Sequence, residues 1–186
     1  VATSYSKACI EIIKSKPNIR LLKVGKSVKG GSKLEIKSLQ SKFLIQESDT
    51  KVITSKNLKA VTVKKPSNRE IDDLLFAFKV ARYVKSNAIV FVKNRKTLGI
   101  GAGQMSRIDS TNIAKTKANK HGLSLKGCVM ASEAFFPFRD NIDLAKKIGV
   151  SSIIQPGGSI KDKEIIAIAD KHNISMVMSG VRVFKH

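Results

Sequence analysis

The chain has 186 residues, enough for one domain or two small ones, and 42% of them are hydrophobic. No apolar run approaches the roughly 20 residues that a membrane-spanning helix needs, and no secretory signal is recognisable, so we expect a soluble cytoplasmic protein without membrane partners. The two cysteines, Cys9 and Cys128, lie far apart and have no histidine at ligand spacing, which argues against a disulfide framework and against a required metal.

The net charge of +21 makes nucleic acid a natural partner to consider. The lysines, however, are spread along the whole chain, aromatic residues are only 5%, and no RNA-binding strand motif or helix-turn-helix pattern accompanies them. We therefore expect no specific nucleic acid partner. The charge is typical of a lysine-rich solvated surface, with a subset of lysines facing small anionic ligands.

Residues 1–65 are predicted to form a smaller α+β segment, because short apolar stretches alternate with turn-forming residues. We expect a flexible loop with a glycine pair from Gly25 to Ser32. The other predicted elements are a helix over Ser4–Lys16 and strands over Ile19–Val24, Leu34–Leu39, Phe43–Gln46, Lys51–Thr54 and Ala60–Val63.

A helix is predicted to begin at Ser67, which forms a capping box with Glu70, and to run to about Lys85. Glu70, Asp72 and Asp73 resemble an acid-base cluster, but negative charge in the first turns of a helix also complements its dipole. We favour the structural interpretation.

The stretch from Asn87 to Arg107 predicts a strand, a turn at 94–96, a second strand and then the start of a helix that runs to about Asn119. Gly99, Gly101 and Gly103 would let a ligand or a second backbone approach closely. Gln104, Ser106 and Arg107 then offer polar groups at a helix N-terminus, so we expect this loop to hold an anion.

After a strand predicted over Lys126–Met130, the sequence Phe135-Phe136-Pro137-Phe138-Arg139-Asp140 is unusual for a connector. Two interpretations stay open. It is either a rigid turn that stacks on a flat ring and hydrogen-bonds its polar edge, or an aromatic plug that covers the sheet.

From Asn141 onward the pattern indicates α/β alternation, with a helix ending at Gly149, a strand over Ser151–Ile154, a helix over Lys161–His172 and a strand over Ile174–Met178. The glycine-rich turn 155–159 is either an anion cradle or an ordinary strand-to-helix turn.

A last strand is predicted near the end of the sequence. In it Arg182 is either a surface charge or the partner of a bound phosphate.

The sequence lacks several common catalytic and cofactor-binding motifs. A dinucleotide fingerprint beginning at Gly99 would need a third glycine where Gln104 stands, and no phosphate loop, nucleophile elbow or zinc deaminase motif is present. His121, His172 and His186 lack ligand-type partners at motif spacing, so we expect surface imidazoles.

The words KSNAIV, GIGAGQMSR, FFPFRD and QPGGSI, in this order and followed by GVR, resemble the C-terminal part of the AICAR transformylase domain of the bifunctional purine-biosynthesis enzymes that also carry IMP cyclohydrolase. The resemblance runs from about Glu11 to His186. It implies an α/β fold over residues 66–186, a cytidine-deaminase-like αβα sandwich without zinc. It also implies formyl transfer from the co-substrate 10-formyltetrahydrofolate to the 5-amino group of AICAR, in a homodimer with shared active sites.

The resemblance also assigns residues. Asn87 resembles the family's active-site asparagine, and Gln104 and Arg107 resemble residues that line the same site. The positions that resemble substrate contacts are Phe135, Phe138 and Asp140, for the AICAR carboxamide and the folate ring, and Arg182, for the nucleotide phosphate.

One departure from the family pattern lowers the expected activity. The Lys-His-x-x-Pro-x-Gly motif that handles the proton in this family does not occur in the sequence, which begins with Val, and neither does the cyclohydrolase domain. We therefore interpret the chain as a C-terminal fragment with little turnover by itself, since losing a general acid or base costs about 10²–10⁴-fold. A non-enzymatic polyanion-binding module and a dimerisation or structural piece stay open as alternatives.

Overall fold

The computed structural model describes residues 1–25, 34–48 and 50–185, and it divides into two compact units, Val1–Thr50 and Lys51–His186. Most of the loop predicted from Gly25, and His186, lie outside the described residues. The predicted boundary between residues 65 and 66 falls later than the observed one. The reason is that residues 51–65 belong to the second unit, where Lys59–Ala60 adds a short strand to its sheet.

The first unit contains one helix and one hairpin. Helix α1 (Lys7–Lys14) is capped by Ser6, and strands β1 (Leu34–Leu39) and β2 (Lys42–Glu47) pair antiparallel. The predicted helix and these two strands are confirmed. The strand predicted over Ile19–Val24 is wrong: in the described part of this segment the backbone forms a single bridge, between Ala2 and Lys23, and no ladder.

The second unit is built on a six-stranded sheet with the order β3-β8-β7-β6-β4-β5. Strands β6, β7 and β8 are parallel, whereas β3, β4 and β5 pair antiparallel with their neighbours. The strands are β3 (Lys59–Ala60), β4 (Ile89–Lys93), β5 (Lys96–Gly101), β6 (Val129–Ser132), β7 (Ser152–Gln155) and β8 (Ser175–Met178).

Two predicted strands of this unit are wrong. Residues 51–54 form no strand, and a 3-10 turn, η1 (Ser55–Asn57), follows them. The last described residues, 179–185, also run as irregular chain. Neither segment forms a ladder with a neighbouring strand, although both have the composition of strands.

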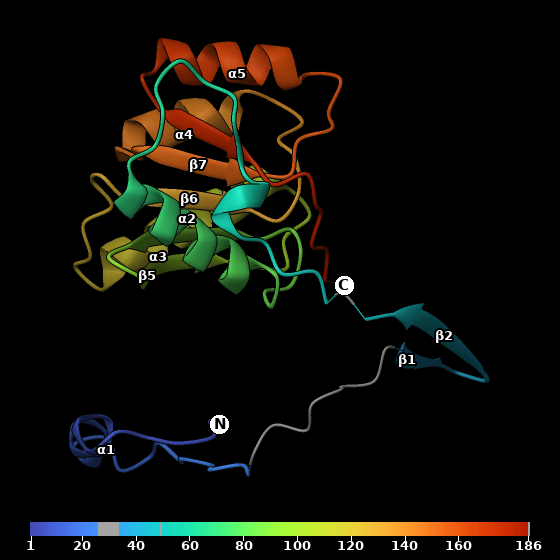
Figure 1. The fold of residues 1–186 in the computed structure, drawn as a ribbon, viewed down its shortest axis with the longest axis vertical. Coiled ribbons are helices and arrows are strands. Elements are labelled where there is room, and N and C mark those ends of the chain that lie inside the picture. The colour runs from blue at the N-terminus through green and yellow to red at the C-terminus, as the bar shows by residue number, and fades with distance from the viewer. Residues whose placement is uncertain (26–33, 49, 186) are drawn as a thin grey trace. The chain divides into compact units, whose positions relative to one another are not determined.

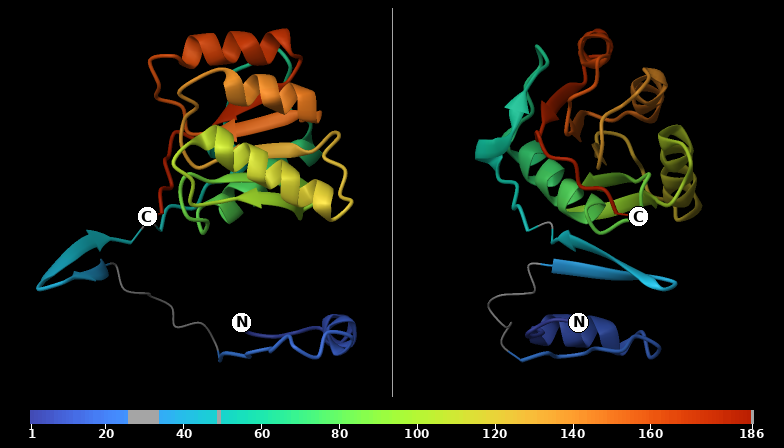
Figure 2. Two further views of the ribbon diagram at one scale, coloured as in Figure 1. Left: turned by 180° about the vertical axis from the view of Figure 1, so that it is seen from behind. Right: turned by 90° about the vertical axis from the view of Figure 1, so that its right-hand side faces the viewer.

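Helices cover both faces of the sheet (Figures 1 and 2). On one face α3 (Arg107–Lys120), α4 (Asp140–Ile148) and α5 (Asp162–Lys171) bury a core with Phe91, Met130 and Ile153. On the other face α2 (Asn68–Ala81) packs with Val90 and with Val183 of the C-terminal segment. The predicted αβα sandwich is thereby confirmed for residues 66–186.

The acidic residues near the start of α2 are explained by local structure. Glu70 completes the predicted capping box with Ser67. The Asp73 carboxylate accepts hydrogen bonds from the backbone N–H groups of Asn94 and Arg95, at 2.9 and 2.6 Å. These two residues have φ of 56° and 55°, as a two-residue hairpin turn requires, so Asp73 stabilises the turn between β4 and β5.

The glycines of β5 serve helix packing. A Cβ on Gly99 would overlap the backbone carbonyl of Ala114, and a Cβ on Gly101 that of Ser110, both in α3. Of the two partners predicted for these positions, a ligand or a second backbone, the structure therefore shows the backbone of α3.

Candidate functional site at the carboxyl edge of the sheet

The candidate residues gather where the parallel strands end. The carboxyl ends of β6, β7 and β8 share one edge of the sheet, where loops of α/β proteins commonly bind ligands. Strand β4 runs antiparallel to β6, with Ile89 opposite Ser132, so the residues before β4 lie at this same edge. The C-terminal segment also arrives there, because the Ser86 N–H donates to the Lys185 carbonyl at 2.9 Å.

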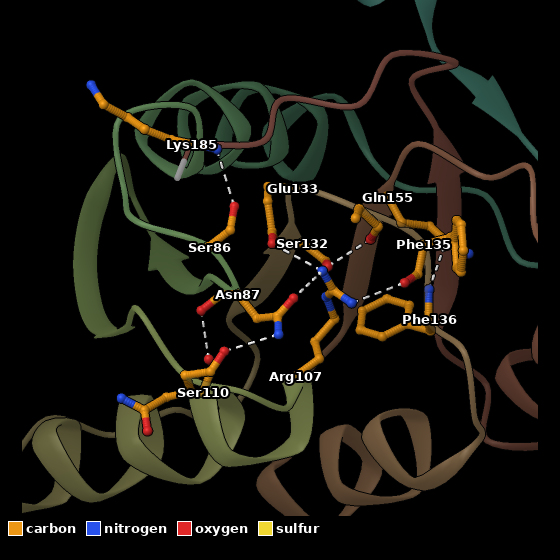
Figure 3. A network of polar contacts seen from close by, with 12 residues as sticks. Ser86, Asn87, Arg107, Ser110, Ser132, Glu133, Phe135, Phe136, Gln155 and Lys185 are labelled. Carbon is orange, nitrogen blue, oxygen red and sulfur yellow. Dashed lines mark hydrogen bonds and ion pairs between the residues drawn. The ribbon is translucent and has the colours of Figure 1, made fainter. Parts of the chain in front are cut away.

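Both polar atoms of the Asn87 side chain, Nδ2 and Oδ1, form hydrogen bonds with other residues of the protein (Figure 3). Its Nδ2 donates to the carbonyls of Gln104 and Met105, at 2.9 and 3.1 Å, and its Oδ1 accepts from Arg107 Nη2 at 3.0 Å. Both amide hydrogens are thus used, and Oδ1 keeps one lone pair. In this arrangement Asn87 can accept one further hydrogen bond.

Arg107 is buried and points into the molecule. Its Nη2 donates to Glu133 Oε1 at 2.9 Å as well as to Asn87, and its Nη1 donates to the Phe135 carbonyl at 3.3 Å (Figure 3). The Glu133 side chain is 0% exposed. The predicted anion site at the start of α3 therefore has an arginine whose charge is already paired with a carboxylate of the chain.

Two atoms of this buried pair have no hydrogen-bond partner among the described residues, Arg107 Nε and Glu133 Oε2. The ion pair is therefore made through a single hydrogen bond and is not bidentate.

Arg182 differs from Arg107 in both exposure and charge pairing. Its guanidinium lies over the half-buried Phe135 ring, 4.7 Å from the ring centroid, and is exposed to solvent. In the part of the chain that is described, it forms no ion pair with a carboxylate. A Cβ on Gly158 would lie 3.5 Å from its Nη2, so the turn after β7 borders the same charge.

The three phenylalanines of the FFPFRD segment have separate roles. Phe136 is fully buried, and its N–H donates to Gln155 Oε1 at 3.2 Å, as an aromatic plug would require. Phe135 packs against Arg182, and the exposed Phe138 lies under Lys161 Nζ at 4.4 Å. The structure supports the plug for Phe136, and stacking of Phe135 or Phe138 on a flat ring stays a prediction.

Three predicted site residues are not bonded to the Asn87–Arg107–Glu133 network by their side chains in the described structure. Gln104 Nε2 donates to the Ala102 carbonyl at 3.0 Å, although the Gln104 main chain does bind Asn87. Asp140 Oδ1 accepts from the main chain and side chain of Asn141, and Phe138 contacts Lys161. The predicted contacts of Phe138, Asp140 and Gln104 with substrate stay predictions.

The backbone amides of the glycine-rich turn after β7 bind the side-chain carboxylate of Asp162. Asp162 Oδ2 accepts from the N–H groups of Gly158 and Ser159, at 2.7 and 3.2 Å. A carboxylate of α5 thus accepts from the amides that an anion cradle would use. The ordinary strand-to-helix turn is the interpretation that the structure supports.

Sequence reasoning missed Glu133 and Gln155, both fully buried polar residues of this edge. One signal pointed to Glu133: it is a charge within a mostly apolar run directly after a buried strand, and such charges are buried only when paired. Its partner Arg107 is 26 positions away, so the pairing itself is invisible in the sequence.

The described residues give little support to a metal site, a membrane-spanning helix or a nucleophilic cysteine. No group of three or more His, Cys, Asp or Glu side chains is placed to hold a metal ion there, and no described helix is long and apolar enough to cross a membrane. Burial raises the pKa of the Cys128 thiol to about 12, so this cysteine is a poor nucleophile at neutral pH.

The family model of the AICARFT/IMPCHase bienzyme matches residues 1–117. This chain belongs to that family. The match includes Asn87, Gln104 and Arg107, and it assigns the chain to a bienzyme family of purine biosynthesis. The motifs that carry the resemblance in the sequence therefore indicated the correct family.

Solved structures with a related arrangement include a dCMP deaminase from cyanophage S-TIM5 in complex with dCMP and dUMP, at 16% identity and a TM-score of 0.41, covering 53% of this chain and 90% of that one. A deaminase/reductase from Thermotoga maritima shows 16% identity and a TM-score of 0.35, over 58% of this chain and 34% of that one. Acinetobacter baumannii RibD shows 15% identity and a TM-score of 0.37, over 55% and 32%.

Proposed function

We propose that this chain forms part of an active site in which the 5-amino group of AICAR receives a formyl group from 10-formyltetrahydrofolate. In that reaction the amine nitrogen bonds to the formyl carbon, the bond between this carbon and N10 of the folate breaks, and a proton passes from the amine to N10. Membership of the bienzyme family supports this reaction class.

The observation that carries the proposal is the contrast between the two arginines. Glu133 neutralises Arg107, whereas Arg182 is exposed, is held against Phe135 and has no carboxylate partner in the described structure. An exposed guanidinium in a fixed position suits the phosphate of a nucleotide, to which it can donate two parallel hydrogen bonds. Phosphate binding is therefore the role proposed for Arg182.

Asn87 has the chemistry to orient the reacting amine. Its Oδ1 keeps one lone pair after accepting from Arg107, and that lone pair can accept a hydrogen bond from the amine. The Asn87 side chain is a neutral amide and the Arg107 guanidinium is bonded to Glu133 and Asn87, so we assign these side chains to orienting groups and not to transferring the proton. We therefore propose that the chain binds and aligns the nucleotide and, alone, turns over slowly.

The proposal retains the homodimer and the shared site that the resemblance implies. Sedimentation equilibrium with and without AICAR tests the dimer. A chain that stays monomeric at every concentration would remove this part of the proposal and leave nucleotide binding to be judged separately.

Calorimetric titration with AICAR ribonucleotide tests the function. Arg182→Ala removes the proposed phosphate partner, and we expect about 10–100-fold weaker binding, the effect of losing a charged hydrogen bond of about 1.5–3 kcal/mol. Lys163→Ala, which removes an equal charge from the exposed face of α5, is the matched control and should leave the affinity unchanged.

The same titration with the AICAR nucleoside, which lacks the phosphate, separates specific from general electrostatic effects. If Arg182 binds the phosphate, wild type and Arg182→Ala bind the nucleoside equally well. Equal losses for Arg182→Ala and Lys163→Ala would contradict the proposal and favour the polyanion-binding alternative.

A further inference from the structure

Among the described residues Glu133 is the one charged residue that is completely buried, and it connects two parts of the site. Its side chain binds Arg107, which in turn binds Asn87 and the Phe135 carbonyl. Its backbone carbonyl accepts from the Val183 N–H at 3.1 Å, next to Arg182. One residue thus contacts both the Asn87 side and the Arg182 side of the candidate site.

We propose that Glu133 is a positioning residue: its carboxylate fixes the Arg107 guanidinium and, through it, the Asn87 amide, while its main chain fixes the segment that carries Arg182. This inference rests on the proposed function, since it concerns the site where the nucleotide would bind. Glu133 itself need not touch the nucleotide.

Stability alone is a weak reason for such a pair. Taking two charges out of water is costly, and replacing a buried ion pair by apolar residues of similar volume is often neutral or stabilising. The pair is also connected through one hydrogen bond, with Arg107 Nε and Glu133 Oε2 left without partners in the described structure. An arrangement optimised for stability would satisfy these atoms.

The pair does satisfy the requirements of orientation. A guanidinium is planar, so contacts at Nη1 and Nη2 to Phe135, Asn87 and Glu133 determine the plane of the whole group. With that plane fixed, Arg107 holds Asn87 Oδ1 on the side opposite the Gln104 and Met105 carbonyls, because rotation of the amide would break the Arg107 bond together with both Nδ2 bonds. Losing the charge of Glu133 should therefore loosen Asn87 without changing the size of any side chain there.

The ligand-free test observes Arg107 directly. In nitrogen-proton spectra, a guanidinium held on several sides gives separate Nη signals, whereas a freely rotating one gives averaged signals. We expect separate signals for Arg107, assigned by their loss in Arg107→Lys, and averaged signals in Glu133→Gln. The control, Glu164→Gln, removes the same charge from the exposed face of α5 and should leave the Arg107 signals unchanged.

The ligand test uses the AICAR nucleoside, so that Arg182 and the phosphate do not contribute. We expect Glu133→Gln to bind it about tenfold more weakly than wild type, as coupled hydrogen-bonded networks commonly show, and Glu164→Gln to bind it equally well. A Glu133→Gln protein with unchanged Arg107 signals, or with unchanged nucleoside affinity, overturns the positioning role.

The two proposals fail in different ways. If the wild-type chain binds neither nucleotide nor nucleoside, the proposed function fails, and the Arg107 spectrum still decides whether Glu133 holds the guanidinium. If Glu133→Gln does not fold, the wild-type spectrum decides, because averaged Arg107 signals there would show that the carboxylate fixes nothing.

Discussion

The two units of the chain use hydrophobic residues in opposite ways. In Val1–Thr50 none of the described residues is buried, and Ile36, Phe43 and Ile45 of the hairpin are more than half exposed. In Lys51–His186 residues of the same types, such as Ile89 and Phe91, are completely buried between helices and sheet. Comparable composition therefore yields a core in one unit and an exposed surface in the other.

The difference shows which interactions hold each unit. In the first unit the hairpin ladder and the Ser6 cap of α1 are local bonds between residues close in sequence. In the second unit strands distant in sequence are joined by burial on both faces of the sheet. Substitutions of one residue type in the two units should therefore have unequal effects on the stability of the folded chain.

The largest contrast is expected for phenylalanine. Phe91→Ala leaves a cavity in the core and should lower the free energy of unfolding by about 3–5 kcal/mol, whereas Phe43→Ala, at an exposed position, should change it by less than about 0.5 kcal/mol. Urea unfolding followed by circular dichroism measures both. Similar losses for the two variants would show that the hairpin is also held by burial.

Glycine gives a smaller contrast. An added Cβ in Gly101→Ala would lie 2.6 Å from the backbone carbon of Ser110, and we expect a destabilisation of about 1–3 kcal/mol. A Cβ on Gly25 meets nothing within 4 Å, so Gly25→Ala should leave the unfolding midpoint unchanged. A neutral Gly101→Ala would mean that α3 can move away from β5 at little cost.

The helix caps sharpen the comparison further. Ser67→Ala removes one half of the capping box of α2 and should cost about 1 kcal/mol of global stability. Ser6→Ala removes the equivalent bond to Cys9 in α1, and we expect faster amide exchange in α1 without a change in the global midpoint. Exchange measurements on both variants test whether α1 unfolds separately.

The smallest effect is expected at the surface of the second unit. The Arg139 guanidinium and then His172 lower the pKa of Asp143 to about 2. An unfolded Asp titrates near 3.9, so this stabilisation is complete above that pH and is lost as the pH falls toward about 2. Both side chains of the pair are partly exposed, so screening by solvent keeps its contribution to stability small.

Unfolding of wild type and Asp143→Asn at pH 5 and near pH 2 measures this contribution. The two proteins should differ at pH 5 and converge at the lower pH. Glu11→Gln removes the exposed partner of Lys14 in α1 and serves as the control. A difference between wild type and Asp143→Asn that persists at low pH would assign the effect to packing and not to charge.

The sequence predicted those features whose chemistry is local. The capping box at Ser67, the turn at Asn94 and the end of α4 at Gly149, which has a φ of 90°, each depend on residues within a few positions. The order of helices and strands from residue 66 to Met178 followed from the same kind of signal, whereas the αβα sandwich was implied by the resemblance to the AICAR transformylase domain.

The predictions that were wrong all depend on contacts between residues distant in the sequence. Strand composition at 19–24, at 51–54 and near Arg182 did not produce strands, because a strand needs a partner that the local sequence does not reveal. The anion site expected at Arg107 is filled by Glu133 of the chain itself, and at the turn 155–159, where an anion cradle and an ordinary turn were both open, Asp162 accepts from the backbone amides. The pairing of Glu133 with Arg107 could be recognised only once the fold placed the two side chains together.

The central claim is that the carboxyl edge of the sheet binds AICAR ribonucleotide, and spectral mapping tests it most directly. In nitrogen-proton spectra recorded at moderate salt, we expect saturable changes centred on Asn87, Arg107, Phe135 and Arg182, with none at Asp143 and His172. Changes spread over the lysines of the whole chain, growing as salt is lowered and never centring on that edge, would contradict the account.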